Sequence, residues 1–152
     1  MNLLTKKLKT LTKIFKCIET SEGDGAIVNR VIGTKECKNL DPFLLLDFFS
    51  AEGDNGFPDH PHRGFETVTY MLSGKFFHED FKGHKGQITA GDVQWMTAGK
   101  GIVHSEMPDT SGENKGFQLW INLPKEQKLC EPLYQEIKCA DFPVIIKRRV
   151  YY

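Results

Sequence analysis

The chain has 152 residues, of which 39% are hydrophobic and 26% are charged. This length and balance predict one globular domain with its own apolar core. Twenty basic residues offset twenty acidic ones, so the chain lacks the basic excess of a protein that binds nucleic acid directly. No apolar run approaches the roughly 20 residues that span a bilayer, and we expect no membrane partner.

The first 19 residues form a predicted basic arm. Residues 1–18 contain five lysines and no acidic residue, and their apolar residues follow neither a helical nor a strand period. The arm lacks the arginines and serines typical of a mitochondrial presequence, so we predict that it leads into a first strand. The four cysteines are scattered without a C-x-x-C pair, which favours reduced thiols in a cytosolic or nuclear protein.

Glycine and proline divide the rest of the chain into short segments about ten residues apart. The segment 43–49 is almost wholly apolar and predicts a buried strand. Helix is expected only near 125–133, if at all. Strands are predicted at 26–32, 43–49, 67–72, 76–78, 87–89, 93–97, 102–106 and 117–123. This pattern predicts an all-β sandwich or barrel.

Two short histidine motifs stand out among these segments. His60 and His62 flank Pro61, and His104 and Glu106 follow about forty residues later. Because Pro61 cannot donate to a sheet, we expect a strand to begin here, at an edge or a bulge. Side chains two apart on a strand point the same way, so the four donors converge if the two strands face each other across a small barrel. Three imidazoles and a carboxylate suit Fe, Mn, Ni, Cu or Zn better than Ca or Mg.

The spacing of these residues resembles that of the cupin motifs. The first cupin motif is matched by His60, His62, Glu66 and Gly74. The second is matched by Gly91, Gly99 and His104, with Thr97 in place of the motif's proline. Longer runs resemble the pirin family within the cupins, namely residues 39–45, 56–68, 78–81, 94–99, 104–108 and 119–123.

The resemblance to pirins implies a fold, a domain organisation and a metal. The fold is a cupin, a double-stranded β-helix or jelly-roll barrel, here a single barrel over residues 20–140. Pirins are bicupins of about twice this length, so this barrel corresponds to the N-terminal cupin, the second cupin is absent, and residues 141–152 form a divergent end. The implied metal is Fe²⁺ or another divalent transition metal. The implied ligands are His60, His62, His104 and Glu106.

A second carboxylate, Glu66, competes with Glu106 for the role of ligand. In most cupins the glutamate of the first motif binds the metal, and in a straight strand Glu66 would point to the same side as His62. Pirin-like sequences use the later glutamate, so we predict Glu106 as the ligand. Glu66 is then a supporting carboxylate, paired with Arg63 or a backbone donor.

Other candidate residues have weaker signals. His78 and His84 flank an acidic loop and are expected to have no role at the metal. Four residues on short strands either line the mouth of the pocket or belong to the core, namely Gln94, Met96, Gln118 and Trp120.

The resemblance also implies two functions of different classes. The first is quercetin 2,3-dioxygenase activity on a flavonol-like small molecule, with Glu106, or else Glu66, as the catalytic base. The alternative is a nuclear, iron-dependent transcriptional co-regulator that binds a Rel-family transcription factor as its protein partner. We accordingly expect the protein in the nucleus and cytoplasm. A third interpretation, a metal-dependent sugar isomerase, rests on the fold alone.

Overall fold

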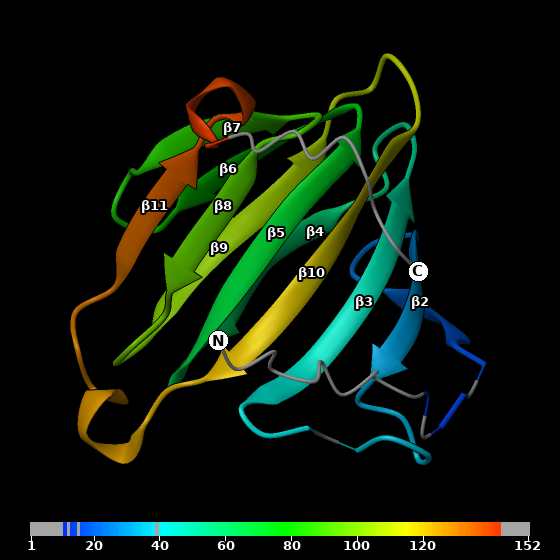
Figure 1. Cartoon of the computed structure of the whole chain (residues 1–152). Coiled ribbons are helices and arrows are strands. Elements are labelled where there is room, and N and C mark those ends of the chain that lie inside the picture. The colour runs from blue at the N-terminus through cyan, green and yellow to red at the C-terminus, as the bar shows by residue number, and fades with distance from the viewer. Residues whose placement is uncertain (1–10, 12, 15, 39, 144–152) are drawn as a thin grey trace, which may run out of the picture.

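The computed structural model describes residues 11, 13, 14, 16–38 and 40–143. This part of the chain forms eleven β-strands and two 3-10 turns (Figure 1), and none of its helices is long and apolar enough to cross a membrane. The strands are β1 (Ile18–Glu22), β2 (Ala26–Ile32), β3 (Phe43–Ala51), β4 (Phe57–His62), β5 (Phe65–Ser73), β6 (Lys75–Asp80), β7 (Lys85–Thr89), β8 (Val93–Thr97), β9 (Ile102–Pro108), β10 (Asn114–Asn122) and β11 (Leu133–Ile137).

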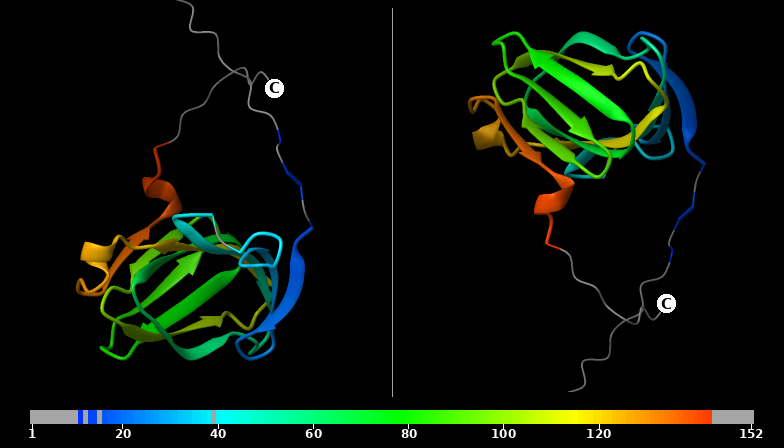
Figure 2. Two further views of the ribbon diagram at one scale, coloured as in Figure 1. Left: turned by 90° about the horizontal axis from the view of Figure 1, so that it is seen from below. Right: turned by 90° about the horizontal axis from the view of Figure 1, so that it is seen from above.

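The strands form two antiparallel sheets. The seven-stranded sheet has the order β1-β2-β3-β10-β5-β8-β11, and the four-stranded sheet has the order β4-β9-β6-β7. Seen end-on, the two sheets curve around a common interior (Figure 2). The predicted all-β cupin barrel is therefore confirmed.

Most of the strands lie where glycine spacing and alternation place them. The strands β2 and β8 have the predicted bounds, and β3 continues two residues further than expected, to Ala51. The expected helix near 125–133 is reduced to the 3-10 turn η1 (Lys125–Gln127), because Pro124 and Pro132 bracket a segment too short for several helical turns. The strand β11 was not predicted. It is short, and its partner is the distant strand β8.

The domain boundaries predicted at residues 20 and 140 are not tested by the structure. Most of the arm at 1–19 and most of the divergent end at 141–152 lie outside the described residues. The second 3-10 turn, η2 (Cys139–Asp141), follows β11 near the end of the described part.

The apolar core lies between the two sheets. In its larger cluster, Phe49 and Phe76 meet edge to face with ring centroids 5.1 Å apart. This cluster consists of Val28, Phe49, Ala51, Met71, Phe76 and Ile88, and a smaller one consists of Met96, Ala98 and Ile102. Elsewhere the interior is polar, because Thr67, Thr69 and Gln94 are also buried. A barrel with polar inward positions has interior room for chemistry as well as for packing.

An ion pair joins the adjacent strands β2 and β3 of the seven-stranded sheet, at one end of the barrel interior. Arg30 on β2 lies opposite Asp47 on β3. The guanidinium donates to both carboxylate oxygens, from Nη2 to Oδ2 at 2.8 Å and from Nε to Oδ1 at 3.0 Å, and also to Glu22 at 2.8 Å. Hydrogen bonding to Asp47 raises the pKa of Arg30 despite its partial burial. The bidentate geometry marks this as one of the stronger ion pairs in a protein.

Replacing Asp47→Asn is expected to lower the free energy of unfolding by about 3 kcal/mol, the lower end of what losing one partner of a buried pair costs. The Asp47 side chain is 8% exposed, while Arg30 is 21% exposed and would keep Glu22. Urea denaturation measures the change. Glu22→Gln is the matched control, because the Glu22 side chain is 38% exposed and its loss should cost less than about 1 kcal/mol. Equal losses in the two variants would contradict this ranking.

Candidate metal centre

The strands β4 and β9, which carry the histidines, are hydrogen-bonded neighbours. His60 lies directly opposite His104 in the register, and Pro61 lies opposite Val103. The histidines thus come together without the two strands facing each other across the barrel, since both strands belong to the four-stranded sheet. The expectation that Pro61 lies on an edge strand is confirmed, but the expectation that the strand begins there is wrong, since β4 begins at Phe57. The strand β4 is at the sheet edge, and its register shifts between Phe57 and His60.

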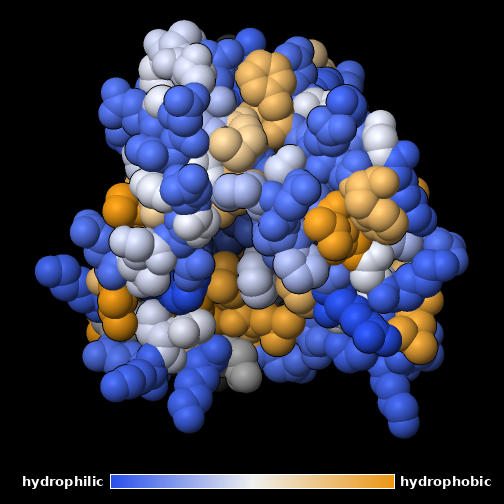
Figure 3. Space-filling model, turned by 180° about the vertical axis from the view of Figure 1, so that it is seen from behind, coloured by the Kyte–Doolittle hydropathy of each residue, from blue (hydrophilic) through white to orange (hydrophobic). Residues whose placement is uncertain are grey.

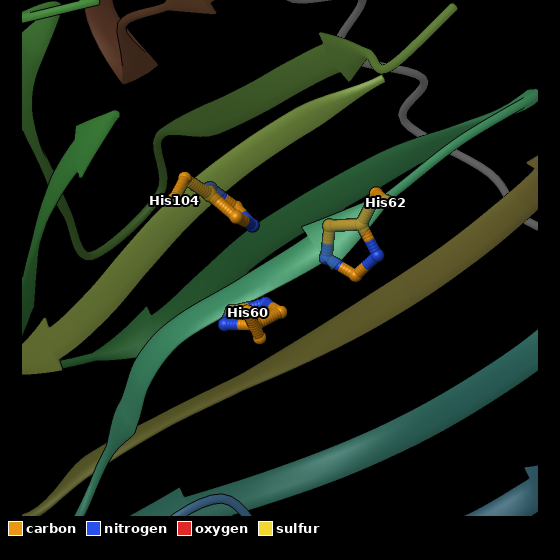
Figure 4. Close-up of side chains that lie close together, drawn as sticks. All are labelled: His60, His62 and His104. Atoms are coloured by element: carbon orange, nitrogen blue, oxygen red, sulfur yellow. The ribbon is translucent and has the colours of Figure 1, made fainter. Parts of the chain in front are cut away.

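Three imidazoles converge on one point inside the barrel (Figure 4). One ring nitrogen from each of His60, His62 and His104 lies within 4.8 Å of the other two. His62 and His104 are buried, and His60 is half-buried. Cross-strand pairing brings His60 and His104 together, and the period of two on β4 brings His62 to the same side.

The protonation of these rings suits metal binding. The Nδ1 atom of His60 lies 2.7 Å from the carbonyl oxygen of Pro58. A carbonyl can only accept, so Nδ1 of His60 donates this hydrogen bond, and Nε2 is the ring nitrogen left to face a metal. Burial, reinforced by His104 and His60, lowers the pKa of His62 to about 3. Burial also lowers the pKa of His104, although Glu106 opposes it. His62 and His104 are therefore neutral near pH 7, as metal ligation requires.

Two of the rings also have unsatisfied nitrogens. Within the described residues, Nε2 of His62 and both ring nitrogens of His104 are buried without a hydrogen-bond partner. A buried polar atom without a partner carries a desolvation cost that a ligand can remove. The donor set and its orphaned lone pairs fit a first-row divalent transition metal.

Glu106 lies beside the imidazoles and forms no part of the three-histidine group. Its Oε2 atom is 4.0 Å from Nε2 of His104, and its side chain is 5% exposed. Gln118 donates to Oε2 at 3.0 Å, and Thr69 donates to Oε1 at 3.4 Å. Burial alone would raise the pKa of Glu106, but the three histidines and the Gln118 amide outweigh it and hold that pKa below its usual value. The carboxylate is therefore an anion next to the imidazoles, and its role as the fourth ligand stays a prediction.

The structure separates Glu66 from the imidazoles. Glu66 is on β5 in the other sheet, where Thr67 and Thr69 point inward, so Glu66 belongs to the opposite face. It accepts a hydrogen bond from the Thr97 hydroxyl at 2.7 Å, where Arg63 or a backbone donor was expected. On a straight strand Glu66 would point to the same side as His62. The strand is interrupted, because Gly64, with φ of +75°, turns the chain from one sheet into the other.

A cavity of about 380 Å³ opens onto the imidazoles. Its lining includes His60, His62 and Glu106, together with the aromatic rings of Phe57 and Trp120. Seen from the side of the four-stranded sheet, the molecule has a recess flanked by apolar side chains (Figure 3). The site is thus a partly enclosed, partly aromatic pocket, the usual form of a small-molecule site.

The sequence left open whether four strand residues line the pocket or belong to the core, and the structure places two of them in each position. Gln118 and Trp120 line the cavity, and Trp120 stacks on Phe65 with ring centroids 4.6 Å apart. Gln94 and Met96 are instead fully buried, at 1% and 0% exposed. All four lie on strands, so only the packing of the two sheets decides which of them reaches the pocket.

The sequence did not predict the charged residues at the cavity wall. Glu22, Arg30 and Asp47 line the cavity through the ion pair described above. Nothing in the sequence singles them out, because they come from three different strands and no motif links them.

His78 and His84 lie outside the three-histidine group, as expected. His78 is buried and lies 2.6 Å from Glu136 on β11. Burial lowers the pKa of His78, although Glu136 opposes it. Tyr134 stacks on His84 with ring centroids 4.3 Å apart. These contacts tie β11 to β6 and give the two histidines a structural role.

The sequence of this chain is similar to those of several known proteins. A family model described as pirin matches residues 25–121. A pirin-like protein of Solanum lycopersicum is 67% identical over 123 residues, which are 81% of this chain and 42% of that protein. Human pirin is 57% identical over 126 residues, which are 82% of this chain and 43% of that protein. The chain thus spans less than half the length of these curated relatives.

Solved structures show the same fold. GK1651 from Geobacillus kaustophilus is 38% identical with a TM-score of 0.80, over 91% of this chain and 55% of that one. A quercetin 2,3-dioxygenase from Acinetobacter baumannii is 38% identical with a TM-score of 0.75, over 84% and 49% of the two chains. The bacterial pirin YhhW from Escherichia coli, in complex with nickel(II), is 27% identical with a TM-score of 0.72, over 80% and 54%.

Proposed function

Because the chain belongs to the pirin family, we propose that it binds a divalent transition metal and acts on flavonols as a quercetin 2,3-dioxygenase. The proposed metal is Fe²⁺ and the proposed ligands are His60, His62, His104 and Glu106. The observation that carries the proposal is the set of three imidazoles whose ring nitrogens lie within 4.8 Å of one another at the cavity. The nickel complex of YhhW and the dioxygenase name of the Acinetobacter protein support it.

The cavity suits a planar aromatic substrate. Its volume of about 380 Å³ lies at the lower end of the range of about 300–1,000 Å³ for small-molecule sites. The rings of Phe57 and Trp120 supply apolar surface on which an aromatic ligand can pack. Glu22 and Asp47 supply carboxylate oxygens that can accept hydrogen bonds from phenolic hydroxyls, although Arg30 occupies part of that capacity.

The chain's own residues would position the substrate and accept its proton. When bound, the metal would supply a Lewis acid and a one-electron redox centre for the reaction of the flavonol with dioxygen. Glu106, an ionised carboxylate beside the imidazoles, would accept the proton of the flavonol 3-hydroxyl. The buried histidines His62 and His104 would hold the metal in the interior of the barrel.

The activity is tested with the purified chain loaded with Fe²⁺ without oxygen and then mixed with quercetin and dioxygen. We expect loss of the flavonol absorbance, equimolar oxygen uptake and release of carbon monoxide. The control is the variant His60→Ala/His104→Ala, which should show none of these. Absence of turnover by a chain that carries stoichiometric iron would overturn the dioxygenase assignment and leave the metal assignment standing.

The co-regulator function, with its nuclear location and transcription-factor partner, stays a prediction. It differs from the dioxygenase in a measurable way, because it requires metal-dependent capture of a Rel-family factor without consumption of a flavonol.

A further inference from the structure

Two residues of β10 connect the cavity wall to Glu106. Gln118 and Trp120 are two residues apart on one strand, so both side chains point into the barrel. Both are half-buried and both line the cavity. Gln118 lies between the indole of Trp120 and the carboxylate of Glu106.

Both hydrogen bonds of this connection are donated toward Glu106: Trp120 donates to Gln118, and Gln118 donates to Glu106. The indole Nε1 of Trp120 can only donate, and it lies 2.8 Å from Oε1 of Gln118. The amide oxygen is therefore held by the indole, and the amide nitrogen faces Glu106, where Nε2 of Gln118 lies 3.0 Å from Oε2. A reversed amide would lose the indole hydrogen bond and place its carbonyl oxygen against the carboxylate. Trp120 thus determines which end of Gln118 meets Glu106.

Gln118 is the nearest hydrogen-bond donor that the described residues offer to Glu106. The other recorded donor, the Thr69 hydroxyl, is at 3.4 Å and contacts the other carboxylate oxygen. The amide of Gln118 also reaches that hydroxyl at 3.4 Å. The oxygen held by Gln118, Oε2, is the one that lies 4.0 Å from Nε2 of His104. The amide therefore controls the carboxylate oxygen on the side of the imidazoles.

We propose that Gln118 is a positioning residue that holds Glu106 toward the three imidazoles, and that Trp120 fixes the orientation of the Gln118 amide. This inference rests on the proposed function, because it takes Glu106 as the fourth metal ligand. It adds a consequence for ligand binding. Trp120 is part of the cavity wall, so a ligand packed on the indole touches the same hydrogen-bonded connection that orients Glu106.

The test uses Co²⁺, whose visible absorption reports its coordination, together with calorimetric titration of the metal-free chain. Gln118→Leu removes the amide at similar size. We expect about 10- to 100-fold weaker Co²⁺ binding, the usual cost of losing a group that orients a ligand, and a changed Co²⁺ spectrum. Trp120→Phe keeps an aromatic ring but removes the donor, and we expect a smaller loss, below about tenfold, with a spectral change in the same direction.

The two variants combined should be non-additive, because Trp120 acts through Gln118. In the background of Gln118→Leu, the further change Trp120→Phe should leave Co²⁺ affinity unchanged. The matched control is Gln135→Leu, an exposed glutamine on β11, which should bind Co²⁺ like the unaltered chain. Far-UV circular dichroism verifies that each variant is folded, and Trp120→Phe tests the proposal even if Gln118→Leu fails to fold.

Three outcomes would overturn the proposal. Unaltered affinity and spectrum in Gln118→Leu would show that the amide does not position Glu106. Full additivity in the double variant would show that Trp120 acts independently of Gln118. Failure of the unaltered chain to bind Co²⁺ would overturn the proposed metal site and this inference together, whereas the first two outcomes leave the metal site intact.

Discussion

Replacing His60 and His104 together by alanine is expected to abolish tight metal binding. These residues are a cross-strand pair, and with His62 they supply the three ring nitrogens within 4.8 Å of one another. The double variant leaves one imidazole and one carboxylate, too few donors to compete with water for a divalent ion. Elemental analysis of the purified variant, loaded in parallel with the unaltered chain, measures the bound metal.

The matched control for this experiment is His84→Ala. His84 is the exposed histidine stacked on Tyr134, outside the three-histidine group, so its removal should leave the metal content unchanged. Stoichiometric metal in the double variant would show that the ion binds elsewhere and that the assigned site is wrong.

Replacing Glu106→Gln is expected to weaken metal binding by more than about 100-fold, above the range for residues that only orient a ligand. The substitution keeps the size of the side chain and removes the anion next to the imidazoles. Glu66→Gln should change the affinity by less than about twofold, because Glu66 belongs to the outer face of the other sheet and bonds Thr97. Titration with Co²⁺ compares the two variants directly.

The comparison of these glutamates decides between two carboxylates that the sequence leaves in competition. Equal losses of affinity in Glu106→Gln and Glu66→Gln would contradict the assignment of Glu106. A loss confined to Glu66→Gln would mean that the first-motif glutamate is the ligand, as in most cupins.

The fold could be predicted largely from local pattern. Alternation and glycine turns indicate a strand wherever a segment has one buried face, as they do for residues 26–32 and 93–97. The pattern failed at 133–137, because that strand is short and follows two prolines. Its pairing with β8 is a long-range contact that no local signal reports.

The three histidines could also be predicted, because a period of two fixes the relative direction of side chains within one strand. His60 and His62 therefore share a side, as do His104 and Glu106. That period carries no information across a turn, however. The chain turns at Gly64 into the other sheet. Glu66 therefore does not point to the same side as His62, although the two residues are an even number of positions apart.

The all-β architecture, the residue types of the proposed metal ligands and the family resemblance could be predicted without a structure, because each depends on residues close together in the chain. Three features depend instead on the tertiary structure: β4 and β9 are neighbours, Glu66 lies away from the imidazoles, and Trp120 is linked to Glu106 through Gln118. The tertiary structure also placed Arg30 against Asp47 at the cavity. These contacts join residues from different strands, and their geometry is set by the register and packing of the two sheets, which no short stretch of sequence encodes.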